Sequence, residues 1–150
     1  MSNKIIGFTQ GTFDMFHIGH LNLLQNAKKQ CDHLIVGVNT DKLVMSYKNI
    51  KPFTSLKERI KIVGAIRYVD EILLCNTLDK EYIWIKKNYH KLFIGDDWRG
   101  SDRWNQTEKA LKEYHVKVIY LPYTKSICST IMRERLYNAI LNENTNKRKA

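Results

Sequence analysis

The stretch from Lys4 to His20, KIIGFTQGTFDMFHIGH, decides the fold because it joins an apolar strand pattern to a helix through a turn that contains glycine. The run at its start is mostly apolar, as a strand buried on both faces must be. Leu21, Leu24 and Ala27 then recur at helical spacing. A strand, a turn and a helix in this order indicate the first unit of an α/β fold.

The same alternation continues along the chain. Apolar runs predict five strands, at residues 4–9, 34–39, 71–75, 92–95 and 116–121. Periodic patterns predict helices at residues 19–30, 55–66, 79–89, 103–114 and 129–141. The spacing of Ser55 and Glu58 predicts a capping box at the second of these helices. Such alternation is typical of a parallel α/β sheet, in which ligands bind beyond the carboxyl ends of the strands.

Two histidines follow the first strand at the start of the predicted helix. Gly11 lets the backbone approach a ligand closely, and the amides and dipole of a helix N-terminus favour anions. His17 and His20 lie three residues apart, so both rings can point into one crevice and hold phosphate oxygens as charge moves to a leaving pyrophosphate. A zinc site and an ordinary pair of surface histidines are the alternatives, although no third metal ligand is close in sequence.

The composition limits the class of protein. The 150 residues suit one domain, which we expect over residues 1–141, with a basic, frayed C-terminal tail at 142–150. A formal net charge of +10 favours an anionic partner. There is no apolar run of about 18 residues for a membrane span and no signal-peptide pattern. Cys31, Cys75 and Cys128 form neither a disulfide framework nor a zinc pattern, which predicts reduced thiols and a cytoplasmic location.

Four motifs, in order, resemble one known superfamily. Gly11–Asp14 followed by His17–His20 is similar to the signature of the HxGH nucleotidyltransferases. Arg67–Glu71 resembles the R-Y-V-D-E box of their cytidylyltransferase branch, and Gly95–Trp98 resembles a segment of bacterial glycerol-3-phosphate cytidylyltransferases. Ser129–Arg133 is similar to the closing S-T-x-x-R segment of the superfamily. The resemblance runs from about residue 4 to residue 141.

The resemblance implies a Rossmann-like, doubly wound parallel sheet of five strands in the order 3-2-1-4-5. It implies transfer of CMP from CTP to a small phosphorylated alcohol, with glycerol 3-phosphate as the best candidate. It also implies Mg²⁺, with Asp14 as the metal ligand, and a homodimer whose subunit contact lies near Arg67–Glu71. The expected catalytic residues are His17, His20, Lys48 and Arg133. The expected nucleotide-binding residues are Gly11, Thr12, Phe13, Asp14, His17, His20, Lys51, Arg67, Asp97, Thr124, Ser129 and Thr130.

The chain departs from the family pattern before the last helix. The family pattern has an arginine where Tyr123 stands, and Lys125 is placed to restore a positive charge nearby. Lys48 and Lys51 match two family lysines, or they belong to a solvated charged loop. Because residues 44–53 have weak helix and strand signals, we expect this segment to be mobile without nucleotide and to become ordered when CTP binds.

Some motif residues also suit structural roles. Asp14 suits loop capping as well as Mg²⁺ binding, and Ser129 suits a helix N-cap. Arg67 suits an ion pair with one of the acidic residues that follow it. Trp98 and Trp104 suit packing and the shelter of a ligand equally well.

Three other functions stay open. An adenylyltransferase of the same superfamily is the nearest, since the closing S-T-x-x-R segment is shared with that branch. A cytidylyltransferase for phosphocholine or phosphoethanolamine is the second. A basic nucleic-acid-binding protein is the third, although the chain has no such motif and its positive residues are scattered. We expect neither nucleic acid nor a membrane as a partner.

Overall fold

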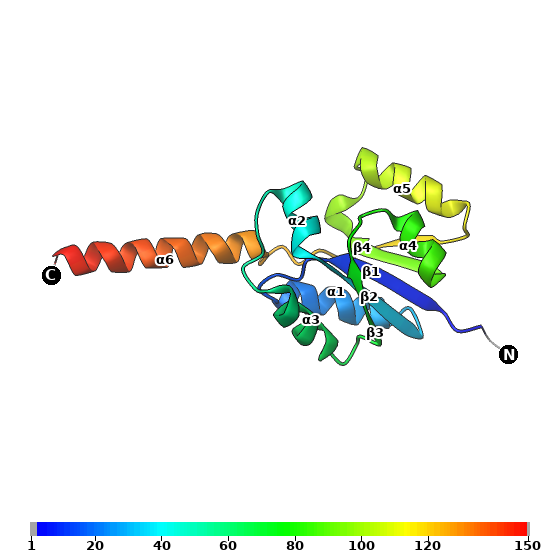
Figure 1. Ribbon diagram of the computed structural model, residues 1–150, viewed down its shortest axis with the longest axis horizontal. Helices are drawn as coiled ribbons and strands as arrows, with labels where there is room; N and C mark the ends of the chain where they lie inside the picture. Colours follow the sequence, from blue (N-terminus) through cyan, green and yellow to red (C-terminus); the bar gives the residue numbers. More distant parts are fainter. Residues whose placement is uncertain (1–2, 150) are drawn as a thin grey trace.

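The computed structural model describes residues 3–149 and contains one sheet of five strands, all paired in parallel (Figure 1). The strands are β1 (Ile6–Gly11), β2 (His33–Asn39), β3 (Glu71–Cys75), β4 (Lys91–Gly95) and β5 (Lys117–Leu121). Their spatial order, β3-β2-β1-β4-β5, confirms the predicted topology.

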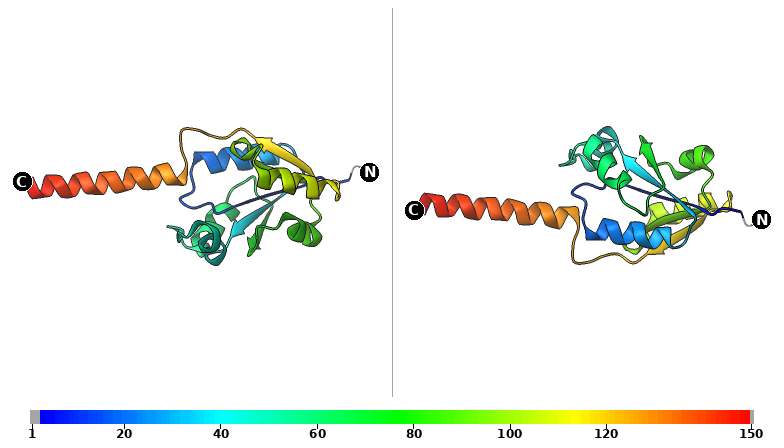
Figure 2. Two further views of the ribbon diagram at one scale, coloured as in Figure 1. Left: turned by 90° about the horizontal axis from the view of Figure 1, so that it is seen from above. Right: turned by 90° about the horizontal axis from the view of Figure 1, so that it is seen from below.

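Helices cover both faces of the sheet, as Figures 1 and 2 show. On one face lie α1 (Ile18–Lys28) and α3 (Leu56–Gly64), and on the other lie α4 (Lys80–Lys87) and α5 (Asp102–Lys112). Leu24 of α1 and Val63 of α3 join one core cluster, whereas Ile83 of α4 and Leu111 of α5 join another. Two cores on opposite faces make the fold doubly wound, and the strands between them must be apolar on both sides.

The sheet opens at its centre, between β1 and β4. Their pairing consists of Gly7 with Lys91 and Phe8 with Leu92, although both strands continue beyond these pairs. This is also the position at which the strand order reverses, because β2 and β3 lie on one side of β1 and β4 and β5 on the other. A topological switch point of this kind leaves a crevice outside the carboxyl ends of the strands.

The first difference from the sequence prediction is α2 (Asp41–Lys48), where weak structure was expected. Thr40 caps this helix by accepting a hydrogen bond from the backbone N–H of Leu43 at 3.3 Å. Asn49 ends it in the left-handed conformation, with φ of 53°. The prediction of an irregular segment from residue 44 is therefore wrong as far as Lys48.

The second difference is the last helix. α6 spans Ser129–Lys149, so the predicted helix end at residue 141 is wrong. Figures 1 and 2 show α6 projecting away from the sheet along the long axis of the molecule. A short 3₁₀ turn, η1 (Asp96–Trp98), follows β4. Within residues 3–149, no helix has both the length and the apolar character that crossing a membrane requires.

Candidate active site

A cleft of about 420 Å³ lies at the carboxyl edge of the sheet, where β1 and β4 part. Most of the residues predicted to bind nucleotide line it, as does Lys48, which was predicted to be catalytic: Gly11, Thr12, Phe13, His17, His20, Asp97, Thr124, Ser129 and Thr130. Asp14 and Arg133 line an adjoining cavity of about 310 Å³, which shares Lys48 with the cleft. Three motifs that are far apart in the sequence, Gly11–His20, Gly95–Trp98 and Ser129–Arg133, therefore meet in one place.

The two histidines are held by the backbone at the start of α1. His17 is the N-cap of this helix, and its Nδ1 accepts a hydrogen bond from Gly19 N at 3.0 Å. Nδ1 of His20 accepts from His17 N at 3.2 Å, and the two rings stack with 3.8 Å between their centroids. Because each Nδ1 is an acceptor, each neutral ring carries its proton on Nε2. The pair therefore supplies two Nε2–H donors to the cleft.

Burial keeps both rings neutral. It lowers the pKa of His17, and burial together with the neighbouring His17 lowers the pKa of His20 to about 3. At neutral pH the cleft thus contains fixed, uncharged hydrogen-bond donors, which suit oxygens that gain negative charge during a reaction. Residues 3–149 contain no group of three or more His, Cys, Asp or Glu side chains that could hold a metal ion, so the structure gives the zinc alternative no support.

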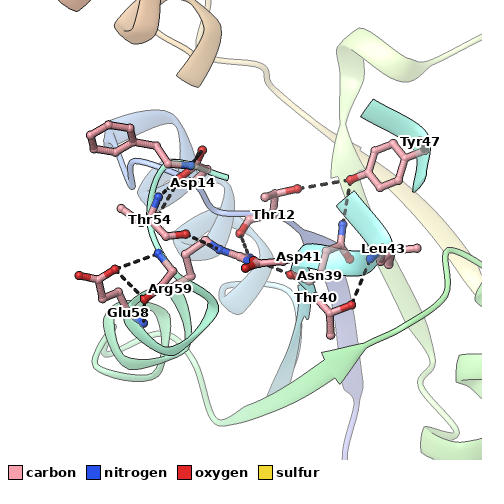
Figure 3. A network of polar contacts seen from close by, with 12 residues as sticks. Thr12, Asp14, Asn39, Thr40, Asp41, Leu43, Tyr47, Thr54, Glu58 and Arg59 are labelled. Carbon is pink, nitrogen blue, oxygen red and sulfur yellow. Dashed lines mark hydrogen bonds and ion pairs between the residues drawn. The ribbon is translucent and has the colours of Figure 1, made fainter. Parts of the chain in front are cut away.

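Asp14 holds the loop between β1 and α1. The residue is 4% exposed, and its carboxylate accepts hydrogen bonds from Phe53 N at 2.8 Å, Thr54 N at 2.9 Å and Thr54 Oγ1 at 2.8 Å (Figure 3). It also forms an ion pair with Arg133. Burial acts to raise the pKa of Asp14, but these hydrogen bonds and the charge of Arg133 hold it below its usual value. With its oxygens engaged in this way, Asp14 fits loop capping rather than the expected Mg²⁺ ligand.

The loop that Asp14 holds has an unusual backbone. Phe13 and Met15, on either side of it, have φ of 55° and 46°, in the left-handed region that disfavours side chains. Ser129 Oγ donates to the carbonyl oxygen of Asp14 at 2.7 Å and so connects α6 to this loop. The expected N-cap role of Ser129 is wrong, because Ser129 is the first residue of α6 and Cys128 Sγ accepts from an amide of its first turn.

Two of the predicted nucleotide-binding residues reach neither the cleft nor the adjoining cavity. Lys48, at the end of α2, lines both, but Lys51 is exposed outside them. Arg67 is exposed in the turn before β3, at the amino edge of the sheet, opposite the cleft. It does not form the alternative ion pair either, because Asp70 and Glu71 pair with other side chains.

The far wall of the cleft comes from the chain between β4 and α6. Asn22 Nδ2 donates to Thr124 Oγ1 at 3.2 Å, which joins this wall to α1. Burial and the neighbouring Asp96 raise the pKa of Asp97. Tyr123 lines the cleft where the family pattern has an arginine, whereas Lys125 is exposed and lies outside it. The positive charge expected from Lys125 is therefore not restored on this wall.

Arg59 is a positioning residue that the sequence analysis missed. It is fully buried, and its guanidinium donates to Thr12 O at 2.7 Å, Asn39 O at 2.8 Å and Thr54 O at 3.2 Å (Figure 3). It also forms an ion pair with Asp41 at 2.6 Å. One side chain of α3 therefore fixes three loops at the edge of the cleft. No local sequence signal distinguishes it from an exposed arginine of an amphipathic helix.

A second cavity, of about 450 Å³, adjoins the cleft on the α4 and α5 side. The two share Gln10, Gly11, Thr12, Lys48 and Trp98. Trp104 lines the second cavity and is buried. Both tryptophans therefore lie where a ligand would contact them, and Trp104 also packs in the core.

Comparison with known proteins agrees with this geometry. The chain is 36% identical over 129 residues to the glycerol-3-phosphate cytidylyltransferase of Bacillus subtilis (strain 168). This alignment covers 85% of this chain and 94% of that protein. It is 31% identical over 121 residues to the FAD synthase of Thermococcus sibiricus (strain DSM 12597 / MM 739). This second alignment covers 80% of this chain and 82% of that protein.

Among solved structures, the lipopolysaccharide core biosynthesis protein from Thermoplasma volcanium GSS1 has the same fold. The TM-score is 0.71 at 22% identity, over 82% of this chain and 100% of that chain. Residues 8–139 match the Cytidylyltransferase-like family, and this match over most of the chain shows that the protein belongs to that family of nucleotidyltransferases.

Proposed function

We propose that this protein is a glycerol-3-phosphate cytidylyltransferase, which transfers CMP from CTP to glycerol 3-phosphate and releases pyrophosphate. The pair of neutral Nε2–H donors at the start of α1, facing a cleft at the switch point of the sheet, is the observation that carries this proposal. The Bacillus subtilis relative bears the same name and is matched over nearly its whole length.

The reaction is a direct displacement at the α-phosphorus of CTP. A phosphate oxygen of the acceptor forms the new bond to this phosphorus while the bond to the bridging oxygen of pyrophosphate breaks. His17 and His20 donate hydrogen bonds where negative charge develops, and Lys48 and Arg133 add positive charge around the phosphates. Positioning and fixed electrostatics supply the rate enhancement, and a covalent intermediate is not needed.

The proposed reaction also requires a divalent metal ion, Mg²⁺, bound to the nucleotide substrate. The family typically uses a divalent metal. A protein-built site does not fit the residues that the structure describes, because Asp14 is engaged by Arg133 and by loop donors and no cluster of three metal-ligating side chains is present among residues 3–149. Mg²⁺ commonly keeps several waters and binds substrate phosphates with few protein ligands. We therefore propose that it arrives bound to CTP.

An adenylyltransferase is the second candidate, because the Thermococcus sibiricus FAD synthase is matched over 82% of its length. The test is kcat/KM with each of the four nucleoside triphosphates against glycerol 3-phosphate, phosphoethanolamine, phosphocholine and flavin mononucleotide. We expect CTP to exceed ATP by at least tenfold, or about 1.4 kcal/mol, with glycerol 3-phosphate as the best acceptor. A tenfold preference for ATP would establish the adenylyltransferase instead.

We further propose a homodimer formed through α6, in place of the contact near Arg67–Glu71 that the resemblance implies. Leu136, Tyr137, Ile140 and Leu141 form a stripe at helical spacing, and each is at least 46% exposed. No described residue of α6 is buried, and a lone helix is marginal in water, so a second copy is the simplest cover for the stripe. Sedimentation equilibrium should show a dimer that Ile140→Glu converts to a monomer, with Asn142→Glu on the opposite side of α6 as the control. A monomeric wild type would rule this contact out.

The thiols agree with a reducing compartment. Cys31, Cys75 and Cys128 are all free, and burial raises the pKa of Cys31 and raises that of Cys75 to about 11. Protonated, buried thiols are poor nucleophiles and poor metal ligands. We therefore propose a cytoplasmic location.

A further inference from the structure

The apolar stripe of α6 is symmetric about its own midpoint. Its residues are Leu136, Tyr137, Ile140 and Leu141. The midpoint of these four falls between Asn138 and Ala139, close to the middle of the helix. If a second α6 lies antiparallel across a two-fold axis at this point, Leu136 faces the partner's Leu141 and Tyr137 faces the partner's Ile140. An isologous contact needs a self-complementary surface of this kind, so the stripe favours an antiparallel pair.

A parallel pair would be unfavourable because of the charges at the end of α6. It would place Lys147, Arg148 and Lys149 against the same three residues of the partner subunit. The last acidic residue of α6 is Glu143, so no carboxylate of the helix end would offset this repulsion. α6 projects away from its own domain along the long axis of the molecule (Figures 1 and 2). An antiparallel pair therefore brings each basic end beside the domain of the other copy.

The antiparallel register places this basic end at the nucleotide cleft. Lys147 lies as far beyond the midpoint of the stripe as Thr130 lies before it, and Arg148 lies as far beyond it as Ser129 lies before it. The partner's Lys147 and Arg148 thus come beside Thr130 and Ser129, and both of these residues line the cleft.

The two cations also lie on the correct side of the helix. Lys147 follows Ile140, and Arg148 follows Leu141, by two helical turns of about seven residues, so both continue the face of the stripe. At its other end this face carries Arg133, which pairs with Asp14 and lines the cavity that adjoins the cleft. The face of α6 that would contact a second copy is therefore also the face that borders the site.

The cleft is short of positive charge without these residues. Lys48 is the only Lys or Arg among the described residues that line it, because Tyr123 stands in place of the arginine of the family pattern. Arg133 is engaged by Asp14. Lys147 and Arg148, in contrast, have no ion-pair partner within residues 3–149. The phosphates of a bound nucleotide and the basic end of a second α6 are therefore complementary in charge.

The basic end of α6 does not reach the cleft of its own chain. α6 is one continuous helix, and Lys147 lies about 27 Å along its axis from Ser129 (Figures 1 and 2). Exposed charges are largely screened beyond about 8 Å at physiological salt. An effect of these residues on the nucleotide must therefore come from another copy of the chain.

We propose that the homodimer is antiparallel through α6 and that the last turn of each α6 completes the nucleotide cleft of the other subunit. The partner's Lys147 and Arg148 donate hydrogen bonds to phosphate oxygens of the bound nucleotide. They supply the positive charge that Tyr123 does not. This inference rests on the proposed dimer and on the binding of CTP in the proposed function, and it makes the dimer the unit that binds CTP tightly.

The first measurement is the Kd of CTP by calorimetry, which requires no acceptor. A variant with both Lys147→Gln and Arg148→Gln should remain a dimer and bind CTP about 3- to 30-fold more weakly, the effect of losing two exposed ion pairs. The matched control is Lys149→Gln, because Lys149 follows Asn142 by two turns and so lies on the side of α6 away from the stripe. It should leave the Kd within about twofold. An unchanged Kd in the dimeric double variant overturns the inference.

Mixed dimers test whether the charge comes from the partner. A His17→Asn chain has an intact α6 but an inactive cleft, whereas the double variant has an intact cleft but no basic end. When the two are mixed in equal amounts and allowed to exchange subunits, about half of the intact clefts meet an intact basic end. At CTP well below KM, the rate per intact cleft should rise to at least about half of the wild-type rate. No gain in a sample shown by two affinity tags to contain mixed dimers overturns the inference.

Ile140→Glu provides a second readout, because it should convert the dimer to a monomer. Its Kd for CTP should rise as in the double variant, and adding Lys147→Gln and Arg148→Gln to it should have no further effect. A further loss would mean that these residues act within one chain, which overturns the inference.

The proposed function and this inference can fail separately. A wild type that transfers CMP as a monomer overturns the inference and leaves the proposed function standing. If no acceptor receives CMP but CTP binding still depends on Lys147 and Arg148 across the dimer, the proposed function fails and the inference stands. If CTP does not bind, both fail.

Discussion

Replacement of His17 by asparagine separates the structural and the chemical parts of one ring. Nδ1 of His17 caps α1 by accepting from Gly19 N at 3.0 Å, and Nε2–H is the donor that the ring offers to the cleft. Asparagine is among the best N-cap residues, so His17→Asn retains an acceptor for the helix and loses the distant donor. Removal of one well-placed donor to a transition state costs about 2.7–4 kcal/mol, or roughly 100- to 1000-fold in kcat.

The assay combines kcat from pyrophosphate release, the Kd of CTP from calorimetry, and the thermal midpoint. We expect kcat of His17→Asn to fall by that factor while Kd stays within about threefold, because the interaction is made mainly in the transition state. The midpoint should stay near that of wild type. His17→Ala should lose the same rate and also about 1 kcal/mol of stability with its cap, which is about 2–4 °C in a chain of this size. If His17→Asn keeps more than about a tenth of wild-type kcat, the ring does not have the transition-state role given to it.

Three other predictions concern stability and mobility. The pKa of His20 falls to about 3 in the folded protein, so the unfolded chain binds a proton at this ring more readily than the folded protein does. The free energy of unfolding is therefore highest above about pH 6.5 and decreases as the pH falls toward 3. Urea titrations should show that wild type loses up to about 4–5 kcal/mol more than His20→Asn over this range, and parallel curves would contradict it. Arg59→Met should lower the free energy of unfolding by about 3–5 kcal/mol, because Asp41 and three backbone carbonyls lose their buried partner; a loss under about 1 kcal/mol would show that the loops hold without it. Amide exchange in residues 49–53 should slow when CTP and Mg²⁺ bind beside Lys48, and unchanged exchange at saturation would count against ordering of this segment.

The strands were predictable because parallel strands buried on both faces must be nearly continuous apolar runs, as in β2. α2 was missed because it is short and buries only Val44 among its residues, so its helical period is weak. Thr40 before Asp41 was the available signal, a cap of the kind that starts helices. α6 was ended too early because its polar second half resembles a solvated tail, although no glycine or proline stops it.

The residues around His17 and His20 were predictable because they lie on one continuous turn from β1 into α1. Arg59 was not, since its burial depends on contacts with segments far away in the sequence. Arg67 was placed wrongly by a motif match. The match predicted that it binds the nucleotide, but in the structure it lies at the amino edge of the sheet, opposite the cleft.

The most direct test follows oxygen atoms through the reaction. Wild-type protein is given CTP, Mg²⁺ and glycerol 3-phosphate whose phosphate carries ¹⁸O, and the products are analysed by mass spectrometry. Direct attack by an acceptor phosphate oxygen on the α-phosphorus of CTP predicts that all of the label stays in CDP-glycerol and that pyrophosphate contains none. Failure to form CDP-glycerol, or the appearance of ¹⁸O in pyrophosphate, would contradict a direct transfer of CMP in this cleft.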